Sequence, residues 1–288
     1  MNTLVKLCLV GGLGAAFLAY QWSEPSLNVE SLKGVRVLVT GASKGIGEQM
    51  AYHYARFGAH IVITGRTEKA LQQVVKKCKE LGAKKAEYIP ADMSSTTDPF
   101  TVVEFALDKL GGLDHLVLNH IGITSFGLWD GDVEHVRWLL QVNFLSYLQM
   151  TKKALPALEE SKGSIIVVSS MAGKIFTPFV APYTATKSAL NGFYGSLQHE
   201  LAMQNRNVSI TICTLGLIDT ESAMRAVKGR TSLIPSPASE AAWQMIKGGA
   251  LRQSEVFYPW TTYVYTFFRD WFPSQRDKII RSSYHLEA

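Results

Sequence analysis

The sequence predicts an α/β fold, a single doubly wound (Rossmann) sheet of about seven parallel strands. Two observations predict it. Short apolar runs, typical of strands buried on both faces, alternate with longer helical segments between residues 35 and 258. The first run, 35–39, leads into a glycine-rich turn and then a helix, the order in which such folds bind a phosphate group. With 288 residues and 47% hydrophobic residues, the chain can build one such sheet and its covering helices.

The composition excludes several classes of function. The net charge is +5, but the basic residues are scattered and form no arm or stripe suited to nucleic acid. The three cysteines, Cys8, Cys78 and Cys213, make no disulfide framework. No Cys/His cluster has zinc spacing, so we expect no metal site.

The N-terminal segment 1–22 is apolar and has the pattern of a membrane or export signal. Lys6 precedes the apolar run and Glu24 and Glu30 follow it, which predicts a cytosolic N-terminus and a luminal body. We expect a signal anchor in the endoplasmic reticulum membrane, with a cleaved signal peptide and secretion as the alternative. Asn207 begins an Asn-Val-Ser glycosylation sequon, which agrees with a luminal body.

The glycine-rich turn spans 40–47, with the sequence TGASKGIG, and precedes a predicted helix at 48–57. Glycines allow a tight turn and a close approach of a pyrophosphate to the helix N-terminus. No Gly-Lys-Ser/Thr follows, so the turn is not a nucleoside-triphosphate loop.

The second predicted strand, 60–64, ends at Gly65-Arg66-Thr67. Folds that prefer NAD place an acidic residue at this point to bind the ribose hydroxyls. Here Arg66, with Lys44 from the glycine turn, can meet a 2′-phosphate instead. The sequence therefore favours NADP(H).

Polar residues follow the later predicted strands, where a doubly wound sheet forms its crevice. Asp92 follows the third strand, to hold an adenine amine or to cap the next helix, and Asn119 follows the fourth. Asn143 lies among apolar residues of a long helix and needs a hydrogen-bond partner, either in the site or as a satisfied amide of the core. The predicted elements of this part are helix 70–81, strand 87–89, strand 115–118, helix 133–158, strand 164–168 and strand 208–213.

Tyr183 and Lys187 lie four residues apart on the helix that follows strand 164–168, and therefore on one face. A neighbouring ammonium should lower the phenol pKa from about 10, which suits a group that exchanges a proton with an alcohol or ketone. Ser170, at the end of the preceding strand, can hold the reacting oxygen.

With the glycine turn, Asn119, Asn143, Ser170 and the Tyr183/Lys187 pair in this order, the chain resembles a short-chain dehydrogenase/reductase over residues 33–258. The stretches TGASKGIG, LVLNHI, VNFLSY, SIIVVSSMAGK, LGLIDTESAM and IKGGALRQSEVFY are most similar to its 11-beta-hydroxysteroid dehydrogenase branch. Two departures from the general family pattern are shared with that branch. His120-Ile121 replaces the usual Asn-Ala, and Leu215 replaces a proline.

The resemblance implies roles for individual residues. Tyr183 is the general acid/base, Ser170 binds the substrate oxygen, and Asn143 positions a water in a proton relay. Lys187 lowers the Tyr183 pKa and holds the nicotinamide ribose. The implied cofactor-binding residues are Gly41, Ser43, Lys44, Gly45, Ile46, Gly47, Arg66, Thr67, Asp92, Met93, Asn119, His120, Ile121, Tyr183, Lys187, Ile218 and Thr220. The implied substrate-binding residues are Ser170, Tyr183, Leu215, Gly216 and Leu217.

The resemblance also implies a homodimer that uses NADP(H) to interconvert an alcohol and a ketone on a hydrophobic substrate, a hydroxysteroid. Two alternatives stay open: a luminal reductase of another lipid ketone or retinoid, and a non-catalytic NADP(H)-binding protein. Residues 259–288 form a C-terminal extension. The aromatic stretch 256–272 suits a membrane interface, a substrate lid or a subunit contact.

Overall fold

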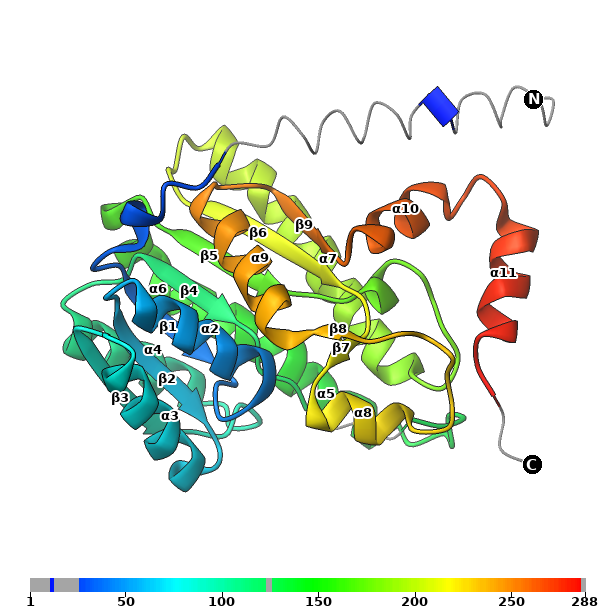
Figure 1. The fold of residues 1–288 in the computed structure, drawn as a ribbon, viewed down its shortest axis with the longest axis horizontal. Helices are drawn as coiled ribbons and strands as arrows, with labels where there is room; N and C mark the ends of the chain where they lie inside the picture. The colour runs from blue at the N-terminus through cyan, green and yellow to red at the C-terminus, as the bar shows by residue number, and fades with distance from the viewer. Residues whose placement is uncertain (1–10, 13–25, 123–125, 286–288) are drawn as a thin grey trace.

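Seven parallel strands form the centre of the molecule, in the order β3-β2-β1-β4-β5-β6-β9 (Figure 1). The structure is a computed structural model and describes residues 11–12, 26–122 and 126–285. The strands are β1 Arg36–Thr40, β2 His60–Gly65, β3 Lys85–Pro90, β4 His115–Leu118, β5 Ser164–Val168, β6 Ser209–Leu215 and β9 Glu255–Tyr258. The predicted doubly wound sheet is confirmed.

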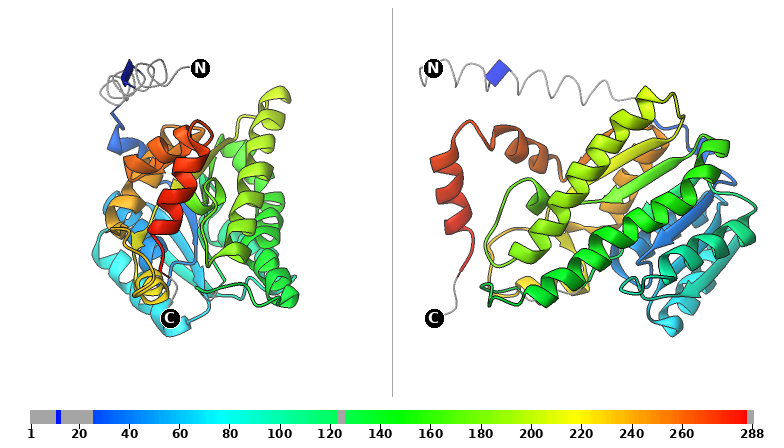
Figure 2. Two further views of the ribbon diagram at one scale, coloured as in Figure 1. Left: turned by 90° about the vertical axis from the view of Figure 1, so that its right-hand side faces the viewer. Right: turned by 180° about the vertical axis from the view of Figure 1, so that it is seen from behind.

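Helices cover both faces of this sheet because successive strand residues point to opposite sides. Val37 and Val39 belong to one buried cluster and Leu38 to the other. The first cluster contains residues of α2 Gly45–Arg56, α3 Glu68–Glu80 and α9 Ala238–Ala250. The second contains residues of α4 Asp98–Leu110, α6 Ser146–Ser161 and α7 Ala181–Met203, whose helices Figure 2 shows from behind.

The chain reverses direction across the sheet between β1 and β4. β1 pairs with β2 on one side and with β4 on the other. The helices that follow β2 and β4, which are α3 and α6, therefore lie on opposite faces of the sheet. A crevice forms at the carboxyl ends of the strands at such a point. Beyond the end of β6, a small second sheet of β7 Ile218–Asp219 and β8 Ser236–Pro237 flanks α8 Glu221–Val227.

The long helix predicted at 133–158 contains one irregular turn. It begins as α5 Val133–Leu140, widens into a π-helical turn at Gln141–Leu145, and continues as α6. Such π-turns are frequent at functional sites. Asn143 lies in this turn.

The C-terminal part extends beyond the sheet. After β9, α10 Trp260–Phe268 packs against the end of that strand, and α11 Pro273–Ser282 stands away from the sheet at the right of Figure 1. The chain then returns toward the body, where Tyr284 forms an antiparallel bridge with Thr231.

The predicted segment 1–22 lies, apart from residues 11 and 12, outside the described residues. Within the described ranges, no helix has the length and apolar character needed to cross a bilayer. The remaining short helices are η1 Val29–Leu32 and η3 Met171–Gly173.

Candidate active site

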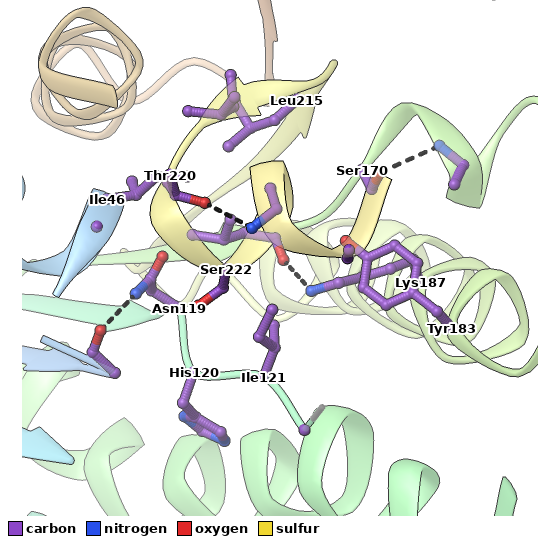
Figure 3. Close-up of a pocket in the computed structure, with 18 of the residues that line it drawn as sticks. Ile46, Asn119, His120, Ile121, Ser170, Tyr183, Lys187, Leu215, Thr220 and Ser222 are labelled. Atoms are coloured by element: carbon purple, nitrogen blue, oxygen red, sulfur yellow. Dashed lines mark hydrogen bonds between the residues drawn. The ribbon is translucent and has the colours of Figure 1, made fainter. Parts of the chain in front are cut away.

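A cavity of about 490 Å³ opens at the carboxyl ends of the strands. Its volume is that of a small-molecule site. Most of the predicted site residues line it: Gly41, Ser43, Lys44, Gly45, Ile46, Arg66, Asp92, Met93, Asn119, His120, Ile121, Ser170, Tyr183, Lys187, Leu215, Gly216, Leu217, Ile218 and Thr220. Figure 3 shows Ser170, Tyr183 and Lys187 on one side of it, with Ile46 and Asn119 on the other.

The glycine turn is packed tightly against the end of β4. Gly41 has φ +63°, and a Cβ there would lie 2.7 Å from the Cα of His120. A Cβ on Gly47 would lie 2.5 Å from the Gly41 carbonyl oxygen. The Asn119 side chain donates to the Thr40 carbonyl at 3.0 Å and so joins the turn to β4. Gly47 therefore supports the turn from behind and does not line the cavity.

Ser170, Tyr183 and Lys187 converge on one wall of the cavity. Ser170 follows β5, and its hydroxyl accepts a hydrogen bond from the Ala172 amide at 3.1 Å. Its side chain lies beside Tyr183 (Figure 3). Lys187 lies one turn further along α7, and its Nζ donates to the Val168 carbonyl at 2.7 Å. The Lys187 Nζ lies 5.6 Å from the centroid of the Tyr183 ring. The predicted grouping of these side chains is present.

The predicted lowering of the Tyr183 pKa is wrong for this arrangement. Burial raises the pKa of Tyr183, and the neighbouring Ser170 side chain only partly opposes that rise. Burial also lowers the pKa of Lys187 to about 7. The ammonium is directed at the Val168 carbonyl rather than at the phenol oxygen, and its own charge is disfavoured by burial.

Asn143 is fully buried and does not line the cavity. Its Oδ1 accepts from the Gly122 amide at 2.7 Å, and its Nδ2 donates to Thr186 Oγ1 at 3.2 Å. The Thr186 hydroxyl in turn donates to the Tyr183 carbonyl at 2.7 Å. Asn143 thus connects the loop after β4 to the turn of α7 that carries Tyr183. Its predicted contact with a water stays a prediction.

The predicted cofactor contact of His120, which lines the cavity, stays a prediction, but its side chain has structural partners. His120 is buried, and Figure 3 shows it directed away from Tyr183 and Lys187. One ring nitrogen lies 2.9 Å from Thr40 Oγ1 and the other 2.7 Å from Ser146 Oγ. Burial, with a contribution from Lys187, lowers the pKa of His120 to about 3. The side chain is therefore a neutral link between β1 and the start of α6.

The two basic residues predicted to meet a 2′-phosphate both line the cavity. Lys44 Nζ pairs with the Glu221 carboxylate at 3.6 Å, which joins the glycine turn to α8. Arg66 is exposed at the end of β2. Thr67 precedes the first residue of α3 and does not line the cavity, so its predicted cofactor contact is not supported by its position.

Asp92 holds its own loop in place. Its Oδ1 accepts from the Ser94 amide at 2.9 Å, and its backbone amide donates to the Asp98 carboxylate at 2.9 Å. It therefore does not cap α4, one of the two predicted roles. The other, a contact with an adenine amine, stays a prediction.

Sequence reasoning missed the outer wall of the cavity. Tyr284 lines it and packs on Phe126 and Phe179, with ring centroids 6.1 and 6.2 Å away. Thr177 lines the same cavity. The only signal in the sequence was the suggestion of a lid in the aromatic stretch, which lies before this residue. Other lining residues that were not predicted include Trp138, Val180, Ser222, Ala226, Val227, Thr231 and Leu233.

Comparison with known proteins agrees with this geometry. The family model of the short chain dehydrogenases matches residues 35–231. The chain belongs to the short-chain dehydrogenase/reductase family. The predicted family resemblance is therefore confirmed.

Relatives of this short-chain dehydrogenase/reductase extend over almost the whole chain. It is 63% identical over 284 residues to the hydroxysteroid 11-beta-dehydrogenase 1-like protein of Danio rerio, covering 99% of both chains. It is 60% identical over 254 residues to the protein of that name from Gallus gallus, covering 88% of each.

Solved structures of the family share its architecture. A short chain dehydrogenase from Burkholderia cenocepacia, solved with NADP, is 26% identical and has a TM-score of 0.71, with 79% of this chain and 97% of that chain covered. A short chain dehydrogenase/reductase from Burkholderia phymatum, solved with NAD, is 19% identical with a TM-score of 0.75, covering 85% and 96%. The second likeness concerns the fold alone.

Proposed function

We propose that this short-chain dehydrogenase/reductase uses NADP(H) to interconvert a secondary alcohol and a ketone on a hydrophobic substrate of the hydroxysteroid type. One observation carries the proposal. Tyr183 and Ser170 lie side by side in the lining of the cavity that the glycine turn also lines. Proton exchange by Tyr183 and dinucleotide binding by the glycine turn can therefore occur in the same cavity.

In ketone reduction, bound NADPH supplies the hydride. The Tyr183 hydroxyl donates its proton to the carbonyl oxygen as that oxygen gains negative charge. The Ser170 hydroxyl holds the same oxygen and stabilises the charge. In the reverse direction, the phenolate form of Tyr183 accepts the alcohol proton, while bound NADP⁺ would take up the hydride.

Lys187 has two tasks in this proposal. Its hydrogen bond to the Val168 carbonyl holds the turn of α7 that carries Tyr183 against the end of β5, and its ammonium would hold the nicotinamide ribose. Asn143 holds the loop after β4 and the start of α7 in place through its hydrogen bonds to Gly122 and Thr186. Buried polar groups of this kind fix a single arrangement when every member has a partner.

A preference for NADP(H) over NAD(H) is supported by the charges at the mouth of the cavity. Lys44 and Arg66 both line it, and no acidic residue stands at the end of β2, where Gly65, Arg66 and Thr67 follow one another. A carboxylate there would repel a 2′-phosphate, whereas a guanidinium binds phosphate in a bidentate manner. The NADP complex of the Burkholderia cenocepacia enzyme agrees with this cofactor.

The outer cavity supports a hydrophobic substrate. Phe126, Val180, Leu217, Val227 and Leu233 bring apolar side chains to it. The names of the curated relatives point to a hydroxysteroid. A lipid ketone or a retinoid would fit the same chemistry and is the second candidate.

The test is a screen of the purified full chain against a panel of steroids, lipid ketones and retinoids, with NADP⁺ and NADPH, following the change in cofactor absorbance. Turnover of a hydroxysteroid or its ketone supports the proposal. Turnover of lipid ketones or retinoids alone would favour the second candidate substrate class. Cofactor binding without turnover on any compound favours a non-catalytic NADP(H)-binding protein.

We also propose that the catalytic body is luminal and anchored in the membrane of the endoplasmic reticulum by residues 1–22. Asn207 is exposed in the loop between α7 and β6, a position that a glycan can occupy. Endoglycosidase should increase the mobility of the expressed protein, and Asn207→Gln should abolish that shift. Carbonate extraction distinguishes an anchored form from a cleaved one. Light scattering on detergent-solubilised protein tests the proposed homodimer.

A further inference from the structure

Lys187 is buried with few partners for its charge. Its exposed fraction is 1%, and its Nζ donates a hydrogen bond to the Val168 carbonyl. Within the described part of the chain it pairs with no carboxylate. An isolated ammonium in such a place is costly unless other groups stabilise it.

Two aromatic rings face the Lys187 ammonium. One is Tyr183, on the same helix. The other is Tyr147, from α6, with the Lys187 Nζ over its ring at 5.8 Å from the centroid. The negative face of an aromatic ring attracts a cation at up to about 6 Å, and more strongly where water is excluded. Tyr147 is fully buried.

Tyr147 is held in this position by His120. The Tyr147 hydroxyl donates to the His120 carbonyl at 2.7 Å, and the two rings meet edge to face at 4.5 Å between centroids. Ser146, the preceding residue, lies 2.7 Å from the His120 ring nitrogen. Two consecutive residues of α6 therefore contact the same histidine.

His120 adds no charge beside Lys187, because burial and Lys187 itself keep its pKa far below neutrality. Burial also keeps Tyr147 a neutral phenol by raising its pKa well above the ordinary value. The titratable groups facing Lys187 are thus Tyr183 on α7, Tyr147 on α6 and His120 after β4. None of them carries a charge near neutral pH.

We propose that Tyr147 is a positioning residue for Lys187, with its ring face holding the ammonium behind Tyr183. The ring stabilises the charged form of Lys187, and His120 fixes the orientation of the ring. The inference rests on the proposed function in one respect, namely that Lys187 takes part in the reaction.

The test measures the pKa of Lys187 directly, without a substrate. The full chain is labelled with ¹³Cε-lysine, its resonances are followed by NMR over pH, and the Lys187 signal is assigned by its absence in Lys187→Met. Tyr147→Leu removes the ring and should lower the pKa of Lys187 by roughly half to one pH unit. Tyr147→Phe keeps the ring and should leave that pKa nearly unchanged. An unchanged pKa in Tyr147→Leu, or an equal change in both variants, would overturn the proposal.

A second series guards against misfolding of Tyr147→Leu. Phenylalanine with increasing fluorine substitution, placed at position 147, keeps the shape of the ring while withdrawing its electron density. The pKa of Lys187 should fall stepwise along the series, and a flat response contradicts the proposal. The turnover of Lys187→Met is measured separately, so a failure of the proposed function is distinguishable from a failure of the role of Tyr147.

Discussion

Lys187 Nζ donates a hydrogen bond of 2.7 Å to the carbonyl oxygen of Val168, the last residue of β5. This bond joins α7 to the end of β5, and Ser170 follows two residues after that end. It fixes Lys187 relative to the serine and the tyrosine at once. Burial fixes the position of the Lys187 side chain, but it also destabilises the charged form of its amino group.

We therefore expect Lys187→Met to be inactive and yet more stable than the wild type. Burial lowers the pKa of Lys187 to about 7, so the folded state disfavours the charged form that the unfolded chain keeps up to about pH 10.5. The cost is full below pH 7 and decreases as the pH rises from about 7 to 10.5. Urea unfolding at neutral pH should show a gain on the order of a few kcal/mol.

The matched control for this experiment is Lys33→Met, at an exposed lysine. The wild type and the control should both gain stability between about pH 7 and 10, and Lys187→Met should lack that gain. A loss of stability in Lys187→Met at neutral pH would show that the buried ammonium is net stabilising.

Arg66→Ala should weaken NADPH binding about 10- to 100-fold, since it removes a charge-assisted contact with the 2′-phosphate. NADH lacks that phosphate and its dissociation constant should stay the same. Fluorescence titration with both cofactors measures the ratio directly. Arg56→Ala, at an exposed arginine at the end of α2, is the control. An equal loss of affinity for both cofactors would show that Arg66 does not bind the 2′-phosphate.

Tyr284→Ala should raise the KM for the best substrate of the panel by about tenfold, because it removes a ring from the outer wall of the cavity. The dissociation constant of NADPH should not change. Tyr265, on α10, is 55% exposed, and Tyr265→Ala serves as the comparison. If the two variants behave alike, the C-terminal return of the chain has no part in substrate binding.

Acid should destabilise the protein through its buried histidines. Burial lowers the pKa of His115 to about 4 and that of His120 to about 3, so both stay neutral in the folded state. Their contribution to stability is complete above about pH 6.5 and is lost progressively as the pH falls toward 3. His120→Asn should show a shallower decline between about pH 7 and 4.5, whereas His199→Asn, at an exposed histidine, should follow the wild type.

Much of the fold was predictable because parallel strands buried on both faces are continuous apolar runs. Strand 164–168 was predicted exactly as β5, and the run at 35–39 differs from β1 by one residue at each end. The first helix was predicted to start at residue 48, but α2 starts at Gly45, because the glycine turn itself passes into the helix.

The site was predictable where it depends on strand ends and helix spacing, as for Asn119, Ser170 and the Tyr183/Lys187 pair. It was not predictable where packing decides. The orientation of His120 depends on Ser146 and Tyr147 of α6, and the effect of Lys187 on Tyr183 depends on burial. Tyr284 reaches the cavity from about 100 residues beyond Tyr183, and no local pattern marks such a return.

The most direct test of the proposed mechanism is single-turnover kinetics of Tyr183→Phe with the best substrate of the panel. The substitution keeps the ring and removes the hydroxyl beside Ser170. The rate of the chemical step should fall by about 10²- to 10⁴-fold or more, while the NADPH dissociation constant stays near that of the wild type. Tyr194→Phe, which removes a buried hydroxyl from the same helix, should keep most of the activity. A near-normal rate in Tyr183→Phe would contradict the proposal that this tyrosine exchanges the proton.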